Sequence, residues 1–153
     1  MKRSSLLLLS VAAAGCIEID GGAVELSWSL RDFDGDSVDS CRDARVDEVE
    51  ICWQPSGGDT PSVDVECQSG QRESFPCSEE NGVSGFTIDP GPTAFWAHPI
   101  CDTGEAAEED TYQAPAPIVR TVQDGQIVTL NSLLIVVSPI DSNCPEAGCT
   151  CSR

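Results

Sequence analysis

The sequence predicts an all-β protein, a β-sandwich of roughly seven to nine short strands stapled by disulfides. Three observations predict it. Short segments alternate apolar and polar residues, and no stretch shows a helical period. Ten prolines and thirteen glycines interrupt the chain at short intervals. A chain of 153 residues suits one domain with a single core.

Strict alternation predicts the first two strands. In residues 23–30 (AVELSWSL) every second residue is apolar, and Glu or Ser stands between. Residues 46–53 (VDEVEICW) repeat the pattern and direct Trp53 to the same side as Val49 and Ile51. This period of two is typical of a strand with one buried face. We therefore expect Trp28 and Trp53 to be core residues, and an aromatic ligand platform formed with Trp96 is the alternative.

Further strands are predicted along the rest of the chain. Segments of the same character cover residues 63–67, 73–77, 85–88, 93–100, 118–122 and 126–137, the last one bent near Asn131 and Ser132. The turn at Asp124 and Gly125 favours a hairpin between the last two segments. Residues 102–117, an acidic stretch with Ala and Pro, are predicted to be a solvated connector. A partner-binding segment centred on Tyr112 is the alternative.

The N-terminus has the pattern of an export signal. Lys2 and Arg3 precede a nine-residue apolar run, LLLLSVAAA, which is too short to span a bilayer. Gly15 and Cys16 follow directly, and the resulting Ala-Gly-Cys resembles the lipobox of bacterial lipoproteins, although Ala13 stands where Leu is usual. The resemblance implies that Cys16 receives a diacylglycerol, becomes the new N-terminus and is acylated. An ordinary signal peptide with Cys16 in a disulfide is the alternative.

The number of cysteines supports this interpretation, because an odd count in an exported chain requires an explanation. Assigning one of the nine to lipid leaves eight, enough for four disulfides in an oxidising compartment. An odd number of these lies in the body, so at least one bridge must join body and tail. Among possible pairs within the body, Cys67–Cys77 is the best single candidate for a disulfide. A zinc site in the tail is the competing interpretation. The eight cysteines expected to form disulfides are Cys41, Cys52, Cys67, Cys77, Cys101, Cys144, Cys149 and Cys151.

The order of these segments also resembles known surface domains. Residues 22–26 (GAVEL), 49–51 (VEI) and 86–93 (FTIDPGPT) are similar to immunoglobulin-like and prealbumin-like or carboxypeptidase-regulatory-like sandwiches of bacterial surface proteins. The whole chain resembles Cys-rich lipoproteins of large-genome Gram-negative bacteria such as myxobacteria. We expect a signal peptide at 1–15, a lipidated tether at 16–22, the sandwich at 23–138 and a Cys-rich tail at 139–153.

One acidic loop has some features of a calcium site. In RDFDGDSVD, residues 31–39, Asp32, Asp34 and Asp36 fall at positions 1, 3 and 5 of an EF-hand-like count, and Asp43 falls at position 12. Gly35 stands at position 4, whereas that loop needs glycine at position 6. The predicted neighbours are strands. We therefore predict a solvated turn and no metal site, with weak calcium binding as the alternative.

Charge and residue types limit the function. The formal net charge is −18, and loss of the two cations Lys2 and Arg3 leaves −20, which excludes nucleic-acid binding. His98 is the only histidine, and we expect it at the surface or on an edge. There is no Gly-x-Ser-x-Gly motif. We expect a non-enzymatic interaction module without cofactor, lipid-anchored in the bacterial envelope at the outer membrane, with an unknown envelope partner. A calcium- or small-ligand-binding lipoprotein is the alternative.

Overall fold

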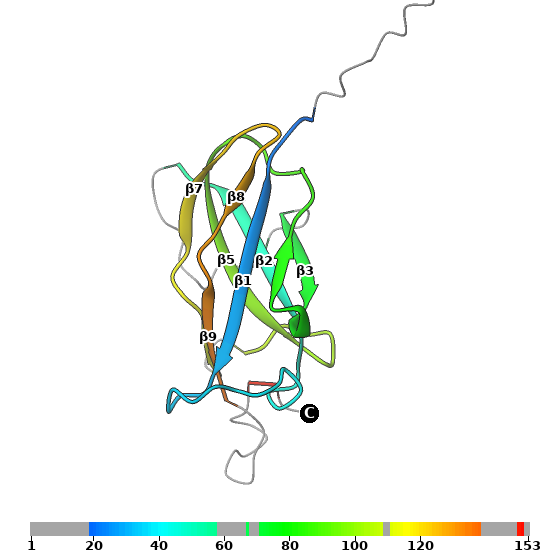
Figure 1. The fold of residues 1–153 in the computed structure, drawn as a ribbon, viewed down its shortest axis with the longest axis vertical. Coiled ribbons are helices and arrows are strands. Elements are labelled where there is room, and N and C mark those ends of the chain that lie inside the picture. The colour runs from blue at the N-terminus through cyan, green and yellow to red at the C-terminus, as the bar shows by residue number, and fades with distance from the viewer. Residues whose placement is uncertain (1–18, 58–66, 68–70, 109–110, 139–149, 152–153) are drawn as a thin grey trace, which may run out of the picture.

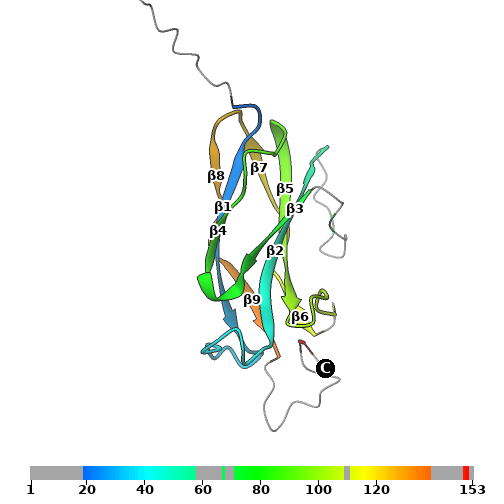
Figure 2. The ribbon, with the colours of Figure 1, turned by 90° about the vertical axis from the view of Figure 1, so that its right-hand side faces the viewer.

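The protein is an all-β sandwich of two sheets (Figures 1 and 2). The computed structural model describes residues 19–57, 67, 71–108, 111–138 and 150–151. Within these residues the chain forms nine strands and one short 3-10 turn. This confirms the fold class predicted from the alternating segments. No helix in the described part of the chain has the length and apolar character needed to cross a membrane.

The first sheet is built around the N-terminal strand. Strand β1 (Ala23–Arg31) has β4 (Asn81–Val83) antiparallel on one side. On its other side β8 (Ile127–Thr129) and then β9 (Leu133–Val137) pair with it in parallel. The short strand β6 (Tyr112–Gln113) pairs with β9 at the edge. The break between β8 and β9 confirms the bend expected near Asn131 and Ser132.

The second sheet is antiparallel and has the order β3-β2-β5-β7. Its long central strands are β2 (Val46–Pro55) and β5 (Gly91–Cys101), and its edges are β3 (Arg72–Pro76) and β7 (Ile118–Val122). The 3-10 turn η1 (Cys77–Glu79) leads from β3 to β4. Residues 85–88 form no strand and contribute one bridge, between Ile88 and Gly22. Of the strand predicted at 63–67, only Cys67 belongs to the described residues.

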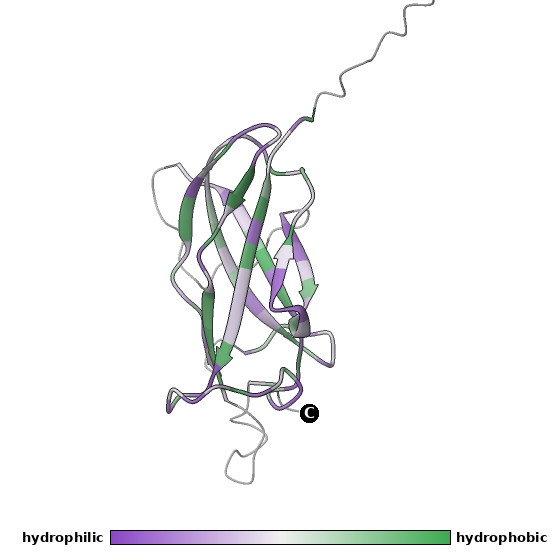
Figure 3. Cartoon of the chain, viewed as in Figure 1, coloured by the Kyte–Doolittle hydropathy of each residue, from purple (hydrophilic) through white to green (hydrophobic). Residues whose placement is uncertain are grey.

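The core lies between the sheets, where the apolar faces of the strands meet. The alternation of hydropathy along β1 is visible in Figure 3. Trp28 and Trp53 are in this core, as predicted. The indole nitrogen of Trp28 donates a hydrogen bond to the Cys77 carbonyl at 3.0 Å, which satisfies its polar atom. Trp96 is also buried, but it is paired with Cys52 and so lies on the opposite face of the second sheet.

The predicted hairpin at Asp124 and Gly125 is wrong. The turn itself forms, because the Gln126 amide donates to the Gln123 carbonyl at 3.2 Å. However, β7 pairs with β5 in one sheet and β8 pairs with β1 in the other. The turn therefore carries the chain between sheets. The Gly125 amide donates to the Gly21 carbonyl, and the Gly21 amide donates to an Asp124 carboxylate oxygen, so the turn also holds the chain before β1.

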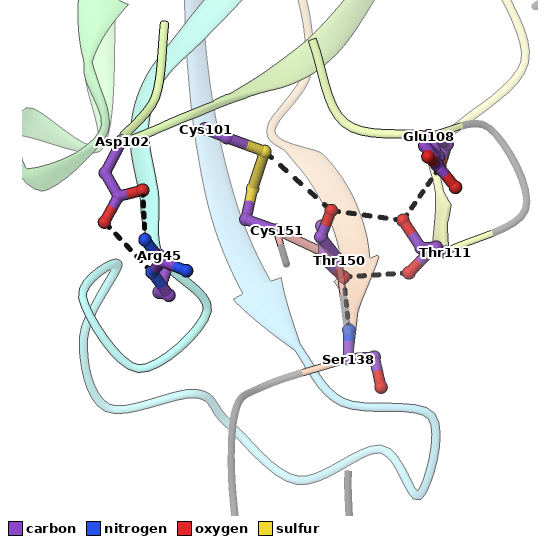
Figure 4. The surroundings of a disulfide bond; sticks show 8 residues. All are labelled: Arg45, Cys101, Asp102, Glu108, Thr111, Ser138, Thr150 and Cys151. Carbon is purple, nitrogen blue, oxygen red and sulfur yellow. Dashed lines mark hydrogen bonds and ion pairs between the residues drawn. A yellow bond between two sulfur atoms is a disulfide. The ribbon is translucent and has the colours of Figure 1, made fainter. Parts of the chain in front are cut away.

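The prediction of a solvated connector at residues 102–117 is also wrong for part of this segment. Ala107, Thr111 and Tyr112 are buried, and Tyr112 belongs to β6. Thr111 and Thr150 exchange hydroxyl-to-carbonyl hydrogen bonds of 3.2 and 2.8 Å (Figure 4). The Ser138 amide also donates to the Thr150 hydroxyl. These bonds hold the connector and the end of the chain together, which acidic composition alone does not indicate.

Three disulfides join the described cysteines: Cys41–Cys77, Cys52–Cys67 and Cys101–Cys151. The bridge from Cys101 to Cys151 confirms that body and tail are linked. The predicted Cys67–Cys77 bridge is wrong, for a reason visible in the β2–β3 register. Arg72, the first residue of β3, lies opposite Cys52, and Cys67, five residues earlier in the sequence, is bridged to Cys52. Cys77 follows the C-terminal end of β3, at the other end of this strand, and is bridged to Cys41.

Candidate functional site

A cleft of about 410 Å³ lies beside the central strands β2 and β5 of the second sheet. Its size falls in the range of small-ligand sites, and several polar side chains converge on it. The residues that give the cleft its chemistry are Glu50, Cys67, Arg72, His98, Glu108 and Tyr112.

Strand register positions the two central side chains of this cleft. Glu50 on β2 lies opposite His98 on β5. Their neighbours along each strand, such as Ile51 and Ala97, belong to the core. Because side chains alternate between the faces of a strand, Glu50 and His98 share the outer face of the second sheet. Both strands are central in the sheet, so this position is fixed by pairing on a rigid scaffold.

The connector closes one side of the cleft. Strand β7 pairs with β5 only as far as Phe95, so the edge of β5 beyond that residue is open to another partner. The Ala107 amide donates to the Pro99 carbonyl at 3.0 Å, and Ala106 forms a bridge with Ile100. The connector thus continues along β5 before it delivers Tyr112 to the side of His98.

His98 is held by one nitrogen and buried at the other. Its Nδ1 lies 2.7 Å from the Tyr112 hydroxyl, and the two rings meet edge to face. Its Nε2 is buried and has no hydrogen-bond partner among the described residues. Burial lowers the pKa of His98, so the imidazole is neutral at neutral pH. His98 is half-buried on the outer face of the second sheet, in the part of β5 that lies beyond its pairing with β7.

Glu50 is one of the two acids of the cleft, and its side chain is only 13% exposed. Burial raises the pKa of Glu50, the Arg72 guanidinium 3.6 Å away opposes this rise, and the Glu48 carboxylate adds to it. Arg72 is 54% exposed, so water weakens its attraction for the carboxylate. Glu50 thus places a carboxyl group at a partly desolvated position.

Two sulfur atoms complete the group around His98. Cys52 and Cys67 are bridged with their Cα atoms 5.3 Å apart. Potential ligand atoms of Cys52, Cys67 and His98 lie within 4.8 Å of one another. Among the described residues this is the one cluster of three such side chains that meets that distance. While the sulfurs are bonded to each other they are not thiolates, and thiolates are what a metal ion requires.

The acidic loop after β1 forms a turn. The Asp32 carboxylate accepts hydrogen bonds from the amides of Asp34 and Asp36 at 3.0 and 2.8 Å. Gly35 adopts a left-handed φ of 91°, and Arg31 donates to its carbonyl. One carboxylate oxygen of Asp32, position 1 of the EF-hand-like count, therefore accepts hydrogen bonds from the backbone of its own loop, as in an Asx turn. Asp32, Asp34, Asp36 and Asp43 form no close cluster of ligand oxygens within the described residues.

The remaining predicted site residues, Cys16, Cys144 and Cys149, lie outside the described residues. Sequence reasoning missed the cleft. The signal that could have found it is the pair of ionisable residues, Glu50 and His98, each flanked by apolar residues within a buried strand. No family model matches the chain. Neither a curated protein nor a solved structure matches it.

Proposed function

We propose that the protein is a non-enzymatic interaction module of the bacterial cell envelope, lipid-anchored through Cys16 in the outer membrane, and that the His98 cleft receives its partner. The observation that carries this proposal is the convergence of Glu50, Arg72 and Tyr112 around His98 in one cleft. Fixed polar groups in a concave site provide orientation and specificity for a bound group.

The state of the histidine supports a binding role over a catalytic one. A general base must present an imidazole nitrogen within hydrogen-bond reach of the proton it removes. In His98, Nδ1 is engaged by the Tyr112 hydroxyl and Nε2 is buried. Neither nitrogen is therefore offered to a substrate in the cleft. The polar atoms that remain accessible, on Arg72 and the carboxylates, suit salt bridges and hydrogen bonds with a partner.

The location of the cleft is consistent with an N-terminal anchor. Gly21 is bound to the turn at 123–126, at the end of the sandwich where β1 begins. Strand β1 runs from there for nine residues, or about 30 Å, to the opposite end. His98 lies three residues before Cys101, where β5 ends close to that opposite end (Figure 2). A chain anchored before Gly21 would therefore direct the half with the cleft away from the membrane.

A small-molecule ligand is the second candidate, and the volume of the cleft favours it. A cleft of about 410 Å³ accommodates a compact ligand better than it accommodates a flat protein surface. The side chains include acids, a guanidinium and a hydroxyl. They would select a ligand that carries both hydrogen-bond donors and acceptors.

The test compares three forms of the anchored protein. These are the wild type, the cleft variant Glu50→Gln with Arg72→Ala, and the control Glu25→Gln on the other sheet. Each form is cross-linked in native envelopes and recovered. We expect wild type and control to recover the same partner and the cleft variant to lose it. Equal recovery by all three would exclude the cleft as the contact. Loss of recovery in the control as well would indicate a general effect of charge.

A further inference from the structure

The buried Nε2 of His98 is the starting point. A buried polar atom without a hydrogen bond is costly and calls for an explanation, such as a redox role or an ion. Ligand atoms of this histidine and of the bridged Cys52 and Cys67 lie within 4.8 Å of one another. We propose that reduction of the Cys52–Cys67 disulfide creates a site for a thiophilic divalent cation of the zinc class, held by Cys52, Cys67 and Nε2 of His98.

The ligand types fit such an ion. Two thiolates and one imidazole are a ligand set that proteins use for zinc, with a fourth position left for water. Calcium and magnesium prefer oxygen ligands, so this set selects against them. The chain has one histidine, so neither of the other two observed bridges can form a comparable site.

The Tyr112 hydroxyl supplies the supporting contact that such sites have. A metal-binding histidine commonly donates its second ring N–H to an oxygen acceptor, which fixes the tautomer and leaves the other nitrogen free to bind. Here Nδ1 lies 2.7 Å from the Tyr112 oxygen. If Nδ1–H donates to that oxygen, the lone pair is on Nε2, the atom that has no partner.

The chemistry balances with a dithiol reductant. One thiolate of the reductant attacks a sulfur of the bridge, and its second thiol then releases the mixed disulfide. The reductant leaves as a disulfide, two electrons pass to the protein, and Cys52 and Cys67 become thiols. Binding of the cation then displaces one proton from each thiol. Reoxidation of the pair would expel the ion, so the bridge and the metal exclude each other.

Cobalt(II) is a suitable probe, since it replaces zinc and absorbs visible light when thiolates bind it tetrahedrally. The purified oxidised protein is reduced with a phosphine, which is then removed under argon, and Co²⁺ is titrated. We expect thiolate-type cobalt absorption from the reduced chain, displaced by Zn²⁺, and no binding by the oxidised protein. His98→Gln, reduced in parallel, should weaken binding at least about tenfold. The control Glu25→Gln should bind like wild type.

Three results would overturn the proposal. The first is a reduced, folded wild type that gives no thiolate–cobalt absorption. The second is equal cobalt affinity in wild type and His98→Gln, because any background from other opened bridges is common to both. The third is loss of the fold in the double variant Cys52→Ser with Cys67→Ser, as measured by near-ultraviolet circular dichroism. The sheet must persist without the bridge for the three ligands to stay together.

Discussion

The Tyr112 hydroxyl and Nδ1 of His98, 2.7 Å apart, join the two sheets of the sandwich at one side. Tyr112 belongs to β6 at the edge of the first sheet, and His98 belongs to β5 in the second. The contact therefore fixes the connector on the sheet and orients the imidazole of the cleft at the same time.

Tyr112→Phe should destabilise the protein by about 1–2 kcal/mol, because the ring is retained while Nδ1 of His98 loses its buried partner. Urea unfolding followed by tryptophan fluorescence measures this change. The double variant Tyr112→Phe with His98→Phe should lose less than the sum of the single variants, since both polar partners are then absent. Strict additivity would mean that the two side chains do not interact.

Glu50→Gln should stabilise the protein at neutral pH and lose this advantage in acid. Burial raises the folded pKa of Glu50 above its unfolded value of 4.5, so the folded state binds more protons between the two values. The cost of the buried charge is therefore present above the folded pKa and disappears as the pH falls toward 4.5. Thermal melts of wild type and Glu50→Gln across this range measure the effect. Glu25→Gln is the matched control, and a constant difference at all pH values would contradict the argument.

Cys101→Ala with Cys151→Ala should cost about 4 kcal/mol in the chain-entropy model, because the bridge closes a loop with a sequence separation of 50. Denaturant unfolding of the double variant measures it. Peptide mapping without reduction should find this bridge together with Cys41–Cys77 and Cys52–Cys67. A peptide pair that links Cys67 to Cys77 would contradict the pairing described above.

Gly82→Ala should destabilise the protein by about 1–3 kcal/mol, because a Cβ at this position would collide with the ring of Phe75. That ring stacks on Trp28 with centroids 6.3 Å apart, so it has little freedom to move. Gly57→Ala is the control, since a Cβ there meets nothing within 4 Å. Similar melting temperatures for the two variants would contradict the expected collision.

The membrane-bound protein should begin at Cys16 and carry lipid. Intact mass should exceed that of residues 16–153 by a diacylglyceryl and an acyl group, and Cys16→Ser should remove this increment. Lys2 is the sole lysine, so a fully acylated mature chain has no primary amine and should not react with an amine-directed ester dye. A bare polypeptide mass, or one dye per chain, would exclude the triacylated form.

The strands could be predicted from sequence because a period of two directly reports which residues face the core. Strands β1 and β2 start at the expected residues for this reason. The same pattern does not indicate which sheet a strand joins. The turn at Asp124 and Gly125 has hairpin residues, yet it connects β7 and β8 in different sheets. Pairing partners depend on contacts across the whole fold, which local turn residues do not encode.

The cleft could not be predicted for a related reason. Glu50 and His98 meet through the register of β2 and β5, and Tyr112 reaches them because the connector follows the open edge of β5. The composition of the connector suggested a solvated segment. Only a few of its residues are buried, such as Ala107 and Thr111. They do not alternate regularly with polar residues, because the segment contacts the sheet only at separate points.

The parallel pairing of β1 with β8 and β9 has a consequence for how the chain folds. Glu25 and Thr129, which are hydrogen-bonded across this pairing, are 104 residues apart in the sequence. Closing so long a loop is entropically costly, and folds that depend on distant pairings form slowly. As the chain emerges from its N-terminus onward, β1 is available early and waits for about a hundred residues before this side acquires its partner. Until then its unpaired edge is exposed to other chains, so assembly of the first sheet should be the slow and aggregation-sensitive step of folding.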